Sequence, residues 1–141
     1  MSAQMFRQIE AFAEALMVAA EAGDEAAFYA GYEELEQFCR ENEGSKRDHP
    51  VLWETLADFT EENPAAIALY QQAYQLADQQ KETEYKASIQ FSLAQRLSEE
   101  GCHTEAIQAV EKAEKFASYT EDDELIEEVA LFKQQLAESL R

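Results

Sequence analysis

The chain of 141 residues carries 11 Lys and Arg against 30 Asp and Glu, a formal net charge of −19, and 46% of its residues are hydrophobic. That apolar share excludes a disordered acidic tail and predicts a single folded domain over residues 1–141. Because Lys and Arg are so few, we expect no direct binding to nucleic acid and none to an anionic membrane surface.

The residue types favour helices. Ala, Glu, Gln and Leu dominate, whereas the chain has only four Gly and two Pro and few β-branched residues. We therefore predict an all-α fold class. Cys39 and Cys102 lie far apart in the sequence and are expected to be reduced thiols packed as small apolar groups. No export signal or membrane span is visible, so we expect a cytoplasmic protein.

The first predicted hairpin covers about residues 3–41. Apolar residues recur at steps of three and four from Met5 to Ala20, and Gly23 follows as the expected C-terminal cap. Asp24 is the expected N-cap of the second helix, whose apolar stripe is Phe28, Tyr32, Leu35 and Cys39. Because only one or two residues join the two helices, they must lie antiparallel. A polar loop over residues 42–49 follows.

Two further hairpins are predicted over about residues 50–80 and 83–118, and a last helix over about 121–140. Pro50 opens a helix that is expected to run to about Glu62, and Asn63 with Pro64 is expected to start the next one. Gly101 is expected to separate the two helices of the third hairpin. The short connections predict about seven antiparallel helices stacked as hairpins, rather than a closed bundle.

Two segments repeat one pattern of small and large residues. Small residues let paired helices approach closely, and the large ones fill the space beside the pair. The first segment has Leu56-Ala57, Ala66-Ile67, Tyr70 and Ala73, and the second has Leu93-Ala94, Leu97, Gly101, Ala106-Ile107, Val110 and Ala113. The repetition makes a stack of similar helical pairs the expected architecture.

The second segment resembles a tetratricopeptide repeat (TPR), most clearly over residues 87–119. It has the family's Leu-Ala pair, turn Gly, Glu-Ala-Ile start of the second helix and closing Ala. Over residues 50–80 the pattern is degenerate, because the turn between Ala57 and Ala66 is shortened and contains no Gly. The resemblance implies an α-α superhelix of hairpins in which the helix 121–140 caps the exposed end.

No residue pattern points to catalysis, to a metal or to a cofactor. His103 is adjacent to Cys102, but one Cys-His pair does not supply the four ligands of a zinc site. The four Gly residues are isolated and form no phosphate-binding loop. We therefore expect no enzyme activity, no metal and no cofactor.

The resemblance implies a ligand site on the concave face, which the first helix of each hairpin lines. The positions that would face a ligand are Glu54, Asp58, Glu61 and Glu62 on the helix 50–62, and Phe91, Gln95 and Glu99 on the helix 83–99. Related cochaperones use Lys, Arg and Asn at such positions to hold an acidic tail, whereas this lining is acidic. An acidic lining predicts an adaptor or chaperone for a basic protein partner.

One alternative function stays open. A small acidic protein can also act as an inhibitor, such as a toxin-immunity protein or a nucleic-acid mimic that blocks a basic enzyme. The inhibitor hypothesis predicts tight, salt-sensitive binding to one basic enzyme. The oligomeric state is open as well, although the exposed apolar end at the first helix is one surface through which two copies could pair.

Overall fold

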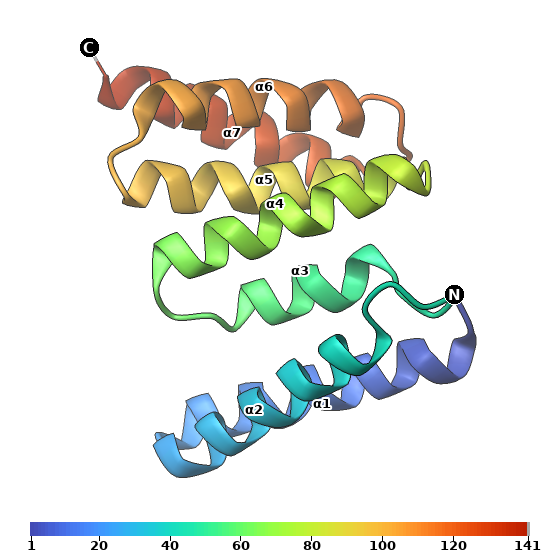
Figure 1. The fold of residues 1–141 in the computed structure, drawn as a ribbon. Helices are drawn as coiled ribbons and strands as arrows, with labels where there is room; N and C mark the ends of the chain where they lie inside the picture. Colours follow the sequence, from blue (N-terminus) through green and yellow to red (C-terminus); the bar gives the residue numbers. More distant parts are fainter. Residues whose placement is uncertain (141) are drawn as a thin grey trace.

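The computed structural model describes residues 1–140, which form seven α-helices and no strand. In chain order these are α1 (Ala3–Ala22), α2 (Glu25–Asn42), α3 (Pro50–Asp58), α4 (Asn63–Gln79), α5 (Thr83–Glu99), α6 (His103–Ala117) and α7 (Asp123–Ser139). The predicted all-α fold is therefore confirmed. Figure 1 shows the helices stacked from α1 and α2 to α6, with α7 beside α5 and α6.

The contacts divide the helices into two layers. Each helix packs on its neighbour in the chain, and α1, α3 and α5 each also contact the next odd-numbered helix. The even-numbered helices lie farther apart and meet only through long side chains, as where the rings of Tyr74 on α4 and Phe116 on α6 have centroids 6.2 Å apart. The odd-numbered helices therefore form a shared side of the stack, and α3 lies between α1 and α5 on that side.

Glycines and an N-cap residue determine two of the turns at one end of the stack. Gly23 follows α1 with a φ of 67°, and Gly101 follows α5 with a φ of 82°. This left-handed backbone costs little only for a residue without a Cβ. The side chain of Asp24 accepts a hydrogen bond of 3.0 Å from the backbone N–H of Ala27, as an N-cap does. In Figure 1 these two turns and the α3–α4 loop lie at the same end of the stack.

The core runs through all seven helices without a break. Trp53 is fully buried at its centre, and its indole N–H donates to the Asp48 carboxylate at 2.8 Å, which ties the loop 42–49 to α3. Between α5 and α6 the core contains small side chains, and Ala94 and Ala106 are both fully buried. These small residues let α5 and α6 make the most extensive contact in the molecule.

Helix α3 is shorter than predicted, because it ends at Asp58 rather than near Glu62. The hydroxyl of Thr60 donates to the carbonyl of Leu56 at 2.8 Å, and such a bond competes with continuation of the helix. Asn63 is not the N-cap of α4 either. It is the first residue of that helix, and its side-chain oxygen accepts a hydrogen bond of 3.1 Å from Arg96.

Candidate functional site

Glu54 does not lie on an exposed face, and the expectation that it does is wrong. Every residue of α3 from Pro50 to Ala57 is buried, and Glu54 is only 8% exposed. Its carboxylate accepts a hydrogen bond of 2.6 Å from the hydroxyl of Ser88 on α5. Burial raises the pKa of Glu54 to about 7, although the Ser88 bond opposes this and the Asp58 charge adds to it. Glu54 therefore belongs to the α3–α5 contact.

Asp58 is exposed, as predicted, but its carboxylate already has partners within the molecule. The hydroxyl of Tyr70 on α4 donates to it at 2.5 Å. Desolvation by the surrounding protein raises the pKa of Asp58, although part of the residue is open to solvent, and the Tyr70 bond and the Arg96 charge oppose that rise. Arg96 also donates to the carbonyl of Ala57 at 3.4 Å. This cluster fixes the end of α3 and the start of the α3–α4 loop.

The three predicted residues on α5 differ in exposure. Phe91 is half-buried, and its ring packs edge-on against Phe132 of α7 with centroids 5.8 Å apart. Gln95 and Glu99 are exposed. The last helix therefore covers part of the face on which the sequence placed Phe91, and it leaves the C-terminal end of α5 open.

Glu61 and Glu62 are exposed, as predicted, but they do not lie at the end of α3. They belong to the loop after α3 and directly precede α4, which begins at Asn63. The dipole of a helix favours negative charge at its N-terminus, so the two carboxylates stabilise the start of α4 rather than oppose the end of α3. This position brings them next to the first hairpin.

Two neighbouring hollows lie between the first hairpin and the α3–α4 loop. Their volumes are about 340 and 360 Å³, and both are lined by Phe28, Tyr29 and Glu61. We call them together the aromatic cleft. The aromatic lining consists of Phe28, Tyr29, Tyr32 and Phe59, and the acidic lining of Asp24, Glu25, Glu61 and Glu62. Each volume is in the range of small-ligand pockets, about 300–1,000 Å³.

Three of the aromatic side chains fix the shape of the aromatic cleft. The rings of Phe28 and Phe59 lie with centroids 6.4 Å apart and join α2 to the loop after α3. The hydroxyl of Tyr32 is within 2.7 Å of the hydroxyl of Thr60. Phe28, Tyr32 and Phe59 are half-buried, so they form a fixed wall that needs no ligand to hold it in place.

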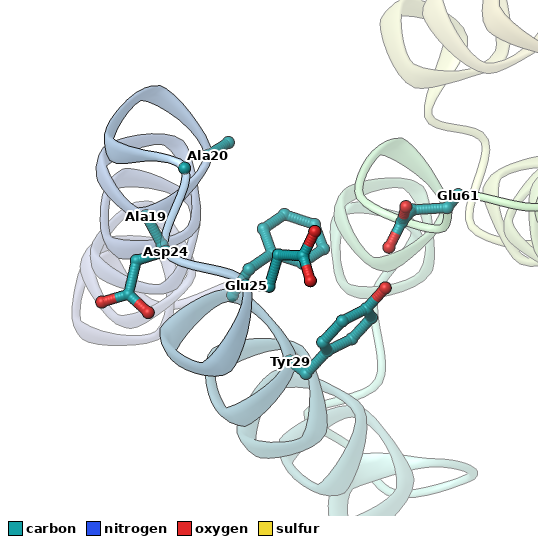
Figure 2. A pocket seen from close by; sticks show the side chains of 8 residues that line it. Ala19, Ala20, Asp24, Glu25, Tyr29 and Glu61 are labelled. Carbon is teal, nitrogen blue, oxygen red and sulfur yellow. The ribbon is translucent and has the colours of Figure 1, made fainter.

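Tyr29 is the exposed member of the aromatic cleft. It is 53% exposed, and Figure 2 shows its hydroxyl directed toward the Glu61 carboxylate, with Glu25 extending into the same space. The pKa of Tyr29 is raised, first by hydrogen bonding with Glu61 and then by the negative charges of Glu61 and Glu25. The shift indicates a locally negative environment.

The carboxylates of the aromatic cleft form no ion pair within residues 1–140, although the Arg96 guanidinium donates to the backbone carbonyl of Glu61 at 3.5 Å. The ion pairs found in residues 1–140 join Arg40 to Glu36 and Glu43, Lys86 to Asp78 and Lys133 to Glu114, and His49, whose pKa is lowered by burial, lies 3.9 Å from Glu82. Asp24, Glu25, Glu61 and Glu62 take part in none of them. Their negative charge is therefore available to a cation from outside the chain.

Sequence reasoning missed the aromatic cleft, although one signal for it was present. Phe28 and Tyr32 were assigned to the buried stripe of α2, but Phe28 and Tyr29 are consecutive. Adjacent residues of a helix point about 100° apart, so both rings cannot enter one narrow core. Two adjacent aromatic residues in the helix that follows the Asp24 N-cap therefore indicate that one of the two rings stays exposed to solvent.

Residues 1–140 give no sign of a metal site, a membrane-spanning helix or a disulfide. No group of three or more His, Cys, Asp and Glu side chains in residues 1–140 is placed to hold a metal ion. None of the seven helices is long and apolar enough to cross a membrane. Both cysteines are free, and burial raises the pKa of the Cys39 thiol to about 12, which keeps it unreactive near neutral pH.

No family model matches this sequence, and no curated protein or solved structure matches it either. Function must therefore be argued from the site itself.

Proposed function

We propose that this chain is a non-catalytic protein-binding module, built from TPR-like hairpins, that binds a basic segment of a partner protein. The observation that carries this proposal is the aromatic cleft, where four carboxylates that form no ion pair within residues 1–140 surround an open aromatic pocket. Aromatic side chains next to complementary charge are typical of protein-binding surfaces. The net charge of −19 adds long-range attraction for a basic partner.

The TPR-like architecture is supported by the order of contacts. In a stack of repeats each hairpin packs on the next through its first helix, and here the backbones of the odd-numbered helices α1, α3, α5 and α7 approach one another in sequence. The clearest repeat pattern, over residues 87–119, coincides with α5, α6 and their close contact.

We propose that the partner binds along the end of the stack that holds the turns within the hairpins. Glu61, Glu62 and Glu99 are exposed there, and Gln95 is exposed one turn earlier on α5. Arg96 on α5 donates to Asn63 at 3.1 Å, which brings the end of α5 close to the start of α4. A basic segment that leaves the aromatic cleft can therefore reach Gln95 and Glu99 along this surface.

The test uses the whole chain as bait for proteins of its native host. Captured proteins should carry basic segments and should elute as the ionic strength rises from about 0.05 to 0.5 M, because surface charge pairs are screened by salt. The variant Glu61→Lys with Glu62→Lys should lose the captured protein. The matched control is Glu127→Lys with Glu128→Lys, two adjacent exposed carboxylates on α7.

Equal capture by the two double variants, or capture that does not depend on salt, would contradict the proposal. If the captured protein is an enzyme whose activity falls when the chain is bound, the inhibitor function replaces the adaptor function. An activity assay of the captured protein, with and without the chain, therefore distinguishes the adaptor function from the inhibitor function.

A further inference from the structure

We propose that the aromatic cleft is a pocket for one arginine side chain of the partner, which stacks on Tyr29 and pairs with Glu61 and Glu25. This inference rests on the proposed function, because it names the group of the basic partner that enters the pocket. It predicts a preference for arginine over lysine, which the net charge alone would not produce. Three features of the cleft favour arginine: the exposed ring, the placement of the carboxylates and the shape of the pocket.

The exposed ring of Tyr29 is the first feature that favours a cationic ligand. Tyr29 lines both hollows, whereas its neighbour Phe28 is half-buried and packs against it edge-on with centroids 5.9 Å apart. Phe28 therefore supports one side of the Tyr29 ring, and Tyr29 stays 53% exposed. The face of an aromatic ring attracts a cation, so an accessible ring in an acidic pocket suits a cationic ligand.

The second feature that favours a cationic ligand is the position of the Glu25 and Glu61 carboxylates. Glu25 comes from the start of α2 and Glu61 from the α3–α4 loop, and Figure 2 shows both side chains approaching the space beside Tyr29. The helix N-termini of α2 and α4 explain why negative charge is tolerated at these places. They do not explain why it surrounds an open hollow of about 340 Å³ with an exposed ring.

The choice of arginine follows from this combination. A guanidinium is planar, stacks on an aromatic face and can bond carboxylates through its fork of N–H groups at the same time. The lysine ammonium is compact and strongly hydrated, so it gains less from a ring. An apolar side chain would desolvate the surrounding carboxylates without pairing them, which is unfavourable.

The test measures three peptides against the whole chain by NMR titration. They are Ac-(Gly-Arg)₃-NH₂, its lysine counterpart and its citrulline counterpart, which keeps the shape of arginine without the charge. We expect the arginine peptide to bind about three- to tenfold more tightly than the lysine peptide, and the citrulline peptide at least about tenfold more weakly. The chemical-shift changes should concentrate at residues 24–29 and 59–62.

Variants locate the interaction. Tyr29→Leu should reduce the preference for arginine over lysine to about one, whereas Tyr29→Phe should keep it, because the ring and not the hydroxyl provides the stacking. The matched control is Tyr119→Leu, at a tyrosine that is 70% exposed and lies outside the aromatic cleft. Glu61→Gln should weaken the arginine and lysine peptides alike, and the exposed Glu121→Gln is its control.

Two results would overturn the inference, and they bear differently on the proposed function. Equal binding of the arginine and lysine peptides, with shift changes spread over all acidic surfaces, would remove the pocket but leave a general acidic docking surface. If no cationic peptide binds at low salt, both the pocket and the proposed basic partner are wrong.

Discussion

Replacing Glu54 by Gln should stabilise this protein at neutral and alkaline pH. The carboxyl of Glu54 is 8% exposed, and its pKa is raised from 4.5 to about 7, first of all by burial. A pKa raised in the folded state means that folding favours the protonated form. Below pH 4.5 the group is protonated in both states, so it causes no penalty. As the pH rises from 4.5 to 7 the unfolded state loses the proton first, and the free energy of unfolding falls.

The size of this effect follows from the shift. A difference of one pKa unit corresponds to about 1.4 kcal/mol, so the rise from 4.5 to about 7 gives a penalty of about 3 kcal/mol above pH 7. A Gln side chain has almost the same shape, and its carbonyl can still accept the hydrogen bond from Ser88. The variant should therefore gain up to about 3 kcal/mol at pH 8 and almost nothing at pH 4.

Urea unfolding of both proteins at several pH values checks this prediction. The other titratable groups contribute equally to both proteins. Subtracting the free energy of unfolding of the parent from that of Glu54→Gln therefore isolates the effect of Glu54. The variant Glu127→Gln, on an exposed position of α7, should change stability by less than about 0.5 kcal/mol throughout. A stability difference for Glu54→Gln that is independent of pH, or a variant less stable than the parent at pH 8, would contradict a raised pKa at Glu54.

Three further substitutions test the contacts that shape the stack. Tyr70→Phe removes the hydroxyl that donates to Asp58 at 2.5 Å and should lower the free energy of unfolding in urea by about 1–2 kcal/mol. Asp48→Ala leaves the buried indole N–H of Trp53 without its acceptor, so stability should fall by about 1 kcal/mol and the emission of this single tryptophan should shift. Gly101→Ala places a Cβ at a φ of 82°, and calorimetry should register a loss of about 1 kcal/mol.

The sequence predicted the number and order of the helices because their signals are local. Gly23, Asp24, Pro50 and Gly101 act on the backbone within one turn of themselves, and all four occupy the predicted ends. The end of α3 was mispredicted because Glu61 and Glu62 are good helix formers. At the observed end the Thr60 hydroxyl bonds to the Leu56 carbonyl, which competes with continuation of the helix and which residue preferences alone do not show.

The candidate site was harder to predict because it depends on how helices cross. Glu54 looks like a solvent-facing residue of an amphipathic helix, but α3 lies between α1, α2, α4 and α5 and is buried on all sides. Phe91 was assigned to an open face that α7 partly covers. Glu61 and Glu62 were identified correctly as exposed, but their proximity to Tyr29 results from packing between α2 and the α3–α4 loop, which no local pattern encodes.

The aromatic cleft opens where two consecutive helices pack less closely than elsewhere in the stack. Between α5 and α6 buried alanines such as Ala94 and Ala106 let two helices close on each other. Where α2 meets the second hairpin, the rings of Phe28 and Phe59 lie between the elements with centroids 6.4 Å apart, and α2 and α3 make the weakest contact of any two consecutive helices. Large rings hold these helices apart, so a hollow opens beside them. The helix dipoles of α2 and α4 favour carboxylates at the same place, and Tyr29 follows Phe28 onto the exposed side. Closer packing of α2 on α3 would bury the rings and remove the cleft, so the loose contact between these two helices is what opens the candidate binding site.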